Sequence, residues 1–288
     1  MNYKIKASKQ EILDASREVI AQEGIITIRH LYYKLVGAGL IQKTEKAYKS
    51  LDTDLINWRK RGLIDWFAFA DSSRRYLGDS GVQSPSEAMA NAISYYTLDK
   101  WIYQPNFVEV WCEKSAIERI LYRACAPYGV RILPARGNIS LTAMAGAARD
   151  YQKKQSEGKE IHVLYFGDYD SSGFNNDRSV PANMKEYFNV DITFTRLAIK
   201  EDQFDQYPEL RREAKPKDLA DPRFADGCMD IDVLDTPQLQ EIARAAIKGL
   251  IDRDQWSKDL EREAYHRQEL QESWEQYFLE KNGFKPFE

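Results

Sequence analysis

Short runs of apolar residues alternate with amphipathic stretches through the middle of the chain. Four runs have the length and composition of buried strands: Phe107–Glu113, Val130–Leu133, Ile161–Phe166 and Ile192–Thr195. Between them the pattern predicts three helices. The first begins with the capping-box sequence Ser115–Glu118 and runs to about Tyr128, the second begins near Ser140, and the third covers roughly residues 182–188. Such alternation predicts an α/β fold with a mainly parallel sheet.

The N-terminal third has a helical pattern. Thr27 can cap a helix over residues 28–38, whose apolar side chains share one side at about 100° per residue. Tyr32 lies on that side, whereas Tyr33 falls off it, next to Arg29. We therefore predict that Tyr32 belongs to the core and that Tyr33 is exposed beside a cation.

A second N-terminal helix is predicted to begin at Thr44 and to end before Gly62, a suitable C-cap. Residues 64–70 could form the wing strand of a winged-helix (helix-turn-helix) domain. Such domains place basic residues against DNA phosphates, and the candidates here are Lys46, Lys49, Arg59, Lys60, Arg61, Arg74 and Arg75, with Lys43 adding charge near the helix start. An ordinary solvated basic face would explain the same charges.

The remaining segments divide the chain into four predicted parts. Residues 1–78 form the DNA-binding domain, 79–104 a linker and connecting helix, 105–252 the sheet domain, and 253–288 a charged helical tail. The Gly- and Ser-rich stretch 77–86 marks the linker. Within 229–252, an acidic turn is followed by another amphipathic helix.

Composition and charge limit the classes of protein. A hydrophobic content of 43% and six Trp indicate a folded chain, and the net charge is −4. Residues 1–80 carry a charge of +4 and the remainder −8, which favours nucleic-acid contact by the first part only. Three dispersed cysteines and three histidines give no zinc pattern and suit a reducing cytoplasm. No membrane span or Walker-type ATP motif is present in the sequence.

Carboxylates follow two of the predicted strands. Glu113 ends the first run, and Asp168 and Asp170 follow Phe166 within a short loop, Ser171–Gly173. Parallel strands bring their carboxyl ends to one edge of a sheet, where ligands bind, and carboxylates suit Mg²⁺. The sequence therefore predicts a magnesium site, although solvated turn residues, or a local pair between Glu113 and Lys114, would leave a similar pattern.

These motifs together resemble a known family. WCEKSAIERIL followed by GDYDSSG resembles the Toprim domain, and RHLYY resembles the R-x-x-Y-Y motif of the topoisomerase VI A subunit and the related meiotic double-strand-break proteins. Ser171 stands where the family usually has Pro, and the Gly-containing turn matches Arg136–Asn138. The resemblance implies a winged helix plus a Toprim domain, in which Glu113, Asp168 and Asp170 bind Mg²⁺ and Tyr33 attacks DNA. It adds Arg29, Lys114 and Arg136 as candidate site residues.

The resemblance also implies partners. It predicts a homodimer in which Tyr33 of one subunit reaches the metal site of the other. The family's topoisomerase subunit works with a GHKL-type ATPase, held through an N-terminal extension, but only 32 residues precede Tyr33 here. Two other functions stay open: a hydrolytic Toprim nuclease, in which water replaces Tyr33, and a non-catalytic DNA-binding module.

Overall fold

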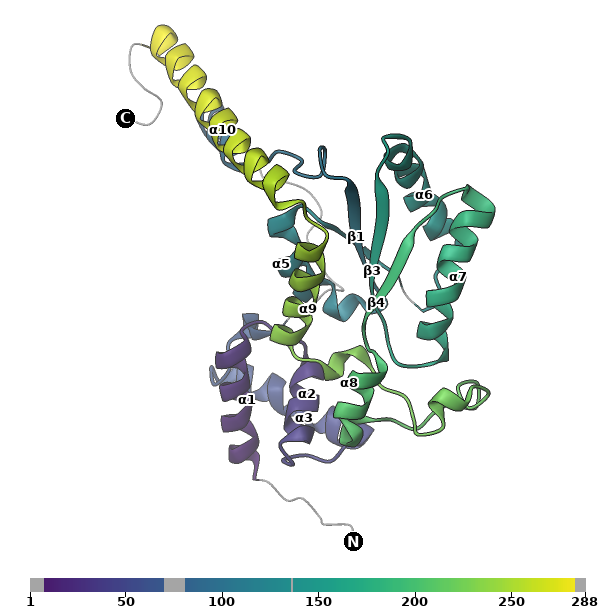
Figure 1. The fold of residues 1–288 in the computed structure, drawn as a ribbon. Helices are drawn as coiled ribbons and strands as arrows, with labels where there is room; N and C mark the ends of the chain where they lie inside the picture. The colour runs from purple at the N-terminus through teal and green to yellow at the C-terminus, as the bar shows by residue number, and fades with distance from the viewer. Residues whose placement is uncertain (1–7, 70–80, 136, 283–288) are drawn as a thin grey trace. The chain divides into compact units, whose positions relative to one another are not determined.

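The computed structural model describes residues 8–69, 81–135 and 137–282 (Figure 1). The chain divides into two compact units. The first unit joins Met1–Arg74 to Phe107–Leu250, and the second joins Arg75–Asn106 to Ile251–Glu288. The four-part domain division drawn from the sequence stays a prediction.

A four-stranded parallel sheet lies at the centre of the first unit and confirms the predicted α/β class. Its order is β2-β1-β3-β4, and each strand matches a predicted apolar run: β1 (Asn106–Cys112), β2 (Arg131–Pro134), β3 (Glu160–Phe166) and β4 (Thr193–Ala198). In the register, Val110 pairs with Ile132 and Leu164 with Thr195. The carboxyl ends of neighbouring β1 and β3 therefore lie at the same edge.

Helices cover both faces of the sheet, which explains why the central strands are almost continuously apolar. In Figure 1, α6 (Leu141–Ser156) and α7 (Ser171–Phe188) lie on one side, and α5 (Ser115–Cys125) and α9 (Thr236–Gly249) lie on the other. The core beside α6 and α7 includes the fully buried side chains of Trp111, Tyr151 and Tyr165. The segment between β4 and α9 contains α8 (Glu201–Gln206) and the 3₁₀ turns η3 (Pro208–Leu210), η4 (Pro222–Phe224) and η5 (Ile231–Val233).

Three helices form the N-terminal part of the first unit: α1 (Lys9–Glu23), α2 (Ile28–Gly37) and α3 (Glu45–Lys60). The predicted caps of α2 and α3 are confirmed, because the hydroxyl oxygens of Thr27 and Thr44 accept hydrogen bonds from backbone N–H groups of the first turn. Helix α2 packs against α1, α3, η3 and η5. This packing brings α2 to the segment that precedes α9.

The predicted wing strand is wrong for residues 64–69. Trp66–Ala68 forms a 3₁₀ turn (η1), and the Asp65 carboxylate accepts the Phe67 N–H at 2.9 Å. A local acceptor of this kind offers the backbone an alternative to a strand ladder. Among the described residues of this segment, only Phe69 makes a β-bridge, to Ile26.

The predicted start of α5 at Ser115 is confirmed, but the predicted capping box does not form, because the N-cap is Lys114 and no side chain caps the helix. One predicted helix start is wrong. Helix α7 begins at Ser171 instead of near residue 182, so Ser171–Gly173 is its first turn and not a loop. Pro181 lies inside α7, and a proline usually ends a helical pattern, which conceals the length of this helix in the sequence.

The second unit contains α4 (Pro85–Tyr95) and the predicted C-terminal helix, α10 (Arg253–Asn282). Glu263 of α10 accepts hydrogen bonds from the Leu98 N–H at 2.8 Å and the Lys100 ammonium at 2.6 Å. The rings of Trp101 and Trp256 pack edge to face, with their centres 5.8 Å apart. In the described part of the chain, no helix is long and apolar enough to cross a membrane.

Candidate functional site

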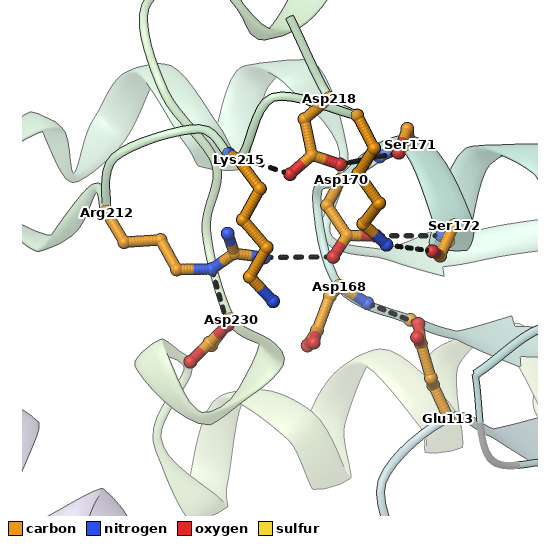
Figure 2. Close-up of polar contacts among 12 residues, drawn as sticks. Glu113, Asp168, Asp170, Ser171, Ser172, Arg212, Lys215, Asp218 and Asp230 are labelled. Carbon is orange, nitrogen blue, oxygen red and sulfur yellow. Dashed lines mark hydrogen bonds and ion pairs between the residues drawn. The ribbon is translucent and has the colours of Figure 1, made fainter.

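The carboxylates predicted from the strand ends lie together at one edge of the sheet. Glu113 follows β1, and its Oε2 accepts hydrogen bonds from the Asp168 N–H at 3.0 Å (Figure 2) and from the Tyr165 hydroxyl at 3.2 Å. Asp170 begins α7 as its N-cap, and its Oδ1 accepts the Gly173 N–H at 2.9 Å. The strand end and the helix cap thus position Glu113 and Asp170, and Asp168 Oδ1 accepts the Ile231 N–H at 2.7 Å.

Burial makes negative charge costly at this edge. Burial, together with the charge of Asp168, raises the pKa of Glu113 to about 7. Burial also raises the pKa of Asp168 to about 6, although Lys114 opposes this shift. The cluster therefore favours added positive charge.

Arg212 supplies positive charge to two of these groups. Its Nη2 lies 2.9 Å from Asp170 Oδ2, and its Nε lies 3.0 Å from Asp230 Oδ1 (Figure 2). The guanidinium therefore bridges the cap of α7 and the segment before η5. Neither Arg212 nor Asp230 was among the site residues predicted from the sequence.

Lys114 gathers three aspartates around one ammonium group. Its Nζ lies 3.4 Å from Asp168, 3.5 Å from Asp230 and 3.4 Å from Asp232. Burial by itself would lower the pKa of Lys114, but the three carboxylates raise it above its ordinary value. Asp232 Oδ1 is buried and has no hydrogen-bond partner in the described structure. The alternative in which Glu113 pairs locally with Lys114 is not what the structure contains.

Tyr33 joins this cluster from α2, and the prediction that its side chain is exposed is wrong. Tyr33 is 7% exposed and Tyr32 is 6% exposed, so both are buried. The Tyr33 hydroxyl donates a hydrogen bond to Asp230 Oδ2 at 3.1 Å. Helical periodicity places the two tyrosines on different sides of α2, but η5 packs against α2, and Tyr33 reaches Asp230 directly before η5. Burial and the charge of Asp230 raise the pKa of Tyr33, against the effect of Arg29.

Arg29 lies beside Tyr33, as predicted. Its Nη2 lies 3.2 Å from Asp230 Oδ2 and its Nε lies 3.6 Å from Asp232 Oδ2. Burial of Asp230 would raise its pKa, but Lys114, Arg29 and Arg212 together lower the pKa to about 2. Asp230 is therefore ionised while it accepts the hydrogen bond from Tyr33.

An open cleft of about 500 Å³ borders Tyr33. We call it the Tyr33 cleft, and its lining includes three tyrosines, four cations and two carboxylates: Tyr32, Tyr33, Tyr48, Arg29, Lys43, Lys49, Arg212, Glu45 and Asp230. Cations and aromatic rings are the groups that contact nucleic-acid phosphates and bases. The cleft is therefore suited to an anionic ligand.

The predicted DNA-binding residues fall into separate groups. Lys46 and Lys49 lie in the first turns of α3 near the Tyr33 cleft, and Lys49 pairs with Glu45 at 2.7 Å. The group Arg59–Arg61 lies at the opposite end of α3, roughly 20 Å away at 1.5 Å per residue. The Arg59 guanidinium packs over Trp66 at 5.3 Å. Three further candidates, Arg74, Arg75 and Arg136, lie outside the described residues.

Sequence reasoning missed Arg212, Asp230 and Asp232 as members of the site, and it gave Lys43 only as added charge near the start of α3. The acidic turn at 229–235 was a signal, because closely spaced aspartates that precede a helix are costly to bury without partners. Arg212 lies in an irregular segment, where no periodicity singles it out.

In the described part of the chain, no group of three or more His, Cys, Asp or Glu side chains is arranged to hold a metal ion. The Mg²⁺ site therefore stays a prediction. No protein-family model and no curated protein sequence matches this chain. The resemblance to the topoisomerase VI A family accordingly depends on the motifs alone.

Proposed function

We propose that this chain cleaves DNA in a Mg²⁺-dependent reaction in which Tyr33 attacks a phosphodiester bond. One observation carries the proposal: Tyr33 and the strand-end carboxylates belong to a single polar cluster. The Tyr33 hydroxyl bonds to Asp230, and Lys114 lies within 3.5 Å of Asp230 and 3.4 Å of Asp168. On this proposal, α1–α3 act as the winged-helix domain and the sheet acts as the Toprim domain.

Glu113, Asp168 and Asp170 are the residues that would hold Mg²⁺. Their oxygen donors fit this hard cation, and their buried charges favour a dication between them. Arg212 pairs with one oxygen of Asp170, so cation binding there competes with the guanidinium. When bound, the ion would stabilise the negative charge that develops on the phosphate.

Tyr33 supplies the nucleophile in this proposal. A bond forms between Tyr33 Oη and phosphorus while the bond between phosphorus and one deoxyribose oxygen breaks. The resulting phosphotyrosyl ester keeps the number of ester bonds constant and can be resealed. Asp230 orients the Tyr33 hydroxyl by accepting its hydrogen bond, the phenol proton passes to solvent, and the leaving deoxyribose oxygen takes a proton from solvent. Arg29 stabilises the phenolate.

A hydrolytic nuclease is the second candidate, and the burial of Tyr33 favours it. A raised pKa makes the Tyr33 phenolate harder to form. Water would then attack the phosphodiester at the same carboxylates, and Tyr33 would only hold Asp230 in place.

The homodimer and the ATPase partner remain predictions. Tyr33 contacts Asp230 of its own subunit, whereas the resemblance implies that it reaches the metal site of a partner subunit.

A trapping experiment tests the proposed nucleophile. Wild-type protein is incubated with DNA and Mg²⁺ and then denatured, and protein bound covalently to a DNA end is measured by gel electrophoresis. We expect an adduct that Tyr33→Phe abolishes, because this change removes only the hydroxyl. Tyr32→Phe is the matched control and should keep the adduct, since the Tyr32 hydroxyl makes only long contacts to the Gln42 and Thr44 carbonyls, at 3.4 and 3.3 Å.

Each result separates the candidates. Cleavage without an adduct, unchanged in Tyr33→Phe, supports the hydrolytic nuclease. DNA binding without cleavage supports a non-catalytic DNA-binding module.

A further inference from the structure

Lys43 occupies an unusual place in the Tyr33 cleft. It lies between α2 and α3, and its ammonium group is 5.9 Å from the centre of the Tyr33 ring. The same ammonium group donates hydrogen bonds to the backbone carbonyls of Leu210 and Arg211. Lys43 therefore links the face of the Tyr33 ring to the segment that carries Arg212.

The charge of Lys43 is not neutralised as its neighbours' charges are. Arg29 pairs with Asp230, Lys49 pairs with Glu45, and Arg212 pairs with Asp170 and Asp230; these pairs are 2.7–3.2 Å long. Among the described residues, Lys43 forms no salt bridge, and the carboxylates of Asp230 and Glu209 act on its charge from beyond salt-bridge distance. Its charge is therefore less fully neutralised than the charges of Arg29, Lys49 and Arg212.

The two hydrogen bonds of Lys43 described above leave one of its N–H donors for a ligand. A lysine has three N–H donors, and the two backbone carbonyls use two of them. The side chain is half-buried, and burial lowers the pKa of Lys43 to about 8. The charges of Asp230 and Glu209 oppose this shift but do not outweigh burial. Burying an ammonium group is costly, and a bound anion in direct contact would reduce that cost.

We infer that Lys43 is the phosphate-binding residue of the Tyr33 cleft and that it holds a phosphate group of the nucleic-acid backbone beside Tyr33. Phosphate oxygens accept charge-assisted hydrogen bonds from ammonium and guanidinium groups. Arg212 lines the same cleft, and its Nη1 has no hydrogen-bond partner in the described structure. The choice of DNA as the source of the phosphate rests on the proposed function. The phosphate subsite itself rests only on the residues that line the Tyr33 cleft.

The test is DNA binding measured without cleavage. Binding of a short fluorescein-labelled DNA duplex is followed by fluorescence anisotropy in EDTA over a series of salt concentrations. We expect Lys43→Gln to weaken binding several-fold and to reduce the slope of log K against log salt by about one, the value for one lost phosphate contact. Lys43→Arg, which keeps the charge, should restore most of the affinity.

Lys154 provides a matched control. Its ammonium group also lies over an aromatic ring, 5.8 Å from the centre of Phe107, but it is paired with Glu157. Lys154→Gln should therefore keep the wild-type affinity and salt slope. Equal slopes in Lys43→Gln, Lys154→Gln and wild type would overturn the assignment.

A second measurement uses the wild-type fold. Wild-type protein is produced with ¹³C,¹⁵N-labelled lysine, the Lys43 side-chain resonance is assigned from its absence in Lys43→Arg, and inorganic phosphate is added. A saturable shift of that resonance supports the subsite, and a resonance that does not move overturns it, even if Lys43→Gln fails to fold. If wild-type protein does not bind DNA while the phosphate shift is present, the proposed function fails and the subsite stands.

Discussion

At the scale of single residues, Asp170 combines two roles that the sequence does not separate. One of its oxygens caps α7 by accepting the Gly173 N–H, and the other pairs with Arg212. An Asp that follows a strand is therefore both a helix start and a candidate metal ligand. A substitution must keep one role while removing the other.

One substitution of Asp170 does this, and a second removes both roles. Asp170→Asn keeps a side-chain oxygen that can cap α7, whereas Asp170→Ala loses the cap, which costs about 1 kcal/mol of folding free energy. Both remove the carboxylate, so we expect both variants to lose Mg²⁺-dependent DNA cleavage, just as wild type should lose it in EDTA. In thermal unfolding, Asp170→Asn should have a higher melting temperature than Asp170→Ala. Wild-type cleavage rates in Asp170→Asn would remove Asp170 from the metal site.

Tyr33 shows what sequence can and cannot predict about single residues. Periodicity separates it from Tyr32, and its neighbour Arg29 is correctly expected. Its hydroxyl bonds to Asp230, which is 197 positions away in the chain. No local pattern contains that contact, so the helical pattern alone places Tyr33 in solvent.

At the scale of elements, the strands were predictable and the start of α7 was not. Burial on both faces of the sheet gives each central strand a run of apolar residues, which can be recognised from the sequence alone. The first turn of α7 is instead rich in Ser and Gly and reads as a loop. Its helical conformation depends on the Asp170 cap and on a close approach of backbone at Gly173.

Gly173 allows that approach because it has no side chain. A Cβ atom there would lie 2.3 Å from the backbone oxygen of Asp168, so the turn that carries Asp168 must move if Gly173 becomes Ala. We expect Gly173→Ala to destabilise the protein by about 1–3 kcal/mol, as for other overpacked sites. Urea unfolding measures this loss.

Gly146 is the matched control for this prediction. It lies inside α6, and nothing lies within 4 Å of a Cβ atom built on it. Gly146→Ala should stabilise the protein by about 0.5–1 kcal/mol, because alanine favours a helix interior. If the two variants change stability equally, the close contact with Asp168 does not constrain the turn.

At the scale of the whole molecule, the first unit is held together by polar contacts between segments far apart in the chain. Glu23 at the end of α1 accepts hydrogen bonds from His30 at 2.8 Å and Lys34 at 2.9 Å, and Lys34 also contacts Asp235 before α9 at 2.9 Å. The sequence predicts α2 and α9, but neither α1 nor these links. They join α1 and α2 to the helix that covers the sheet, and so support the position of Tyr33.

This arrangement predicts a specific dependence of stability on pH. Burial by itself would raise the pKa of Glu23, but His30 and Lys34 lower it to about 2, below the ordinary value of 4.5. A carboxylate with a depressed pKa stabilises the folded state fully above its unfolded pKa, and the effect is lost as the pH falls through about 2. Glu23→Gln should therefore lower the free energy of unfolding by about 2–3 kcal/mol at pH 7, with a difference from wild type that shrinks steadily below pH 4.5.

Glu18→Gln, at an exposed position of the same helix, is the control and should change the free energy of unfolding by less than about 0.5 kcal/mol. Urea unfolding from pH 7 to pH 3 measures both variants, and a Glu23→Gln difference that does not vary with pH would show that the charge of Glu23 does not hold these helices together.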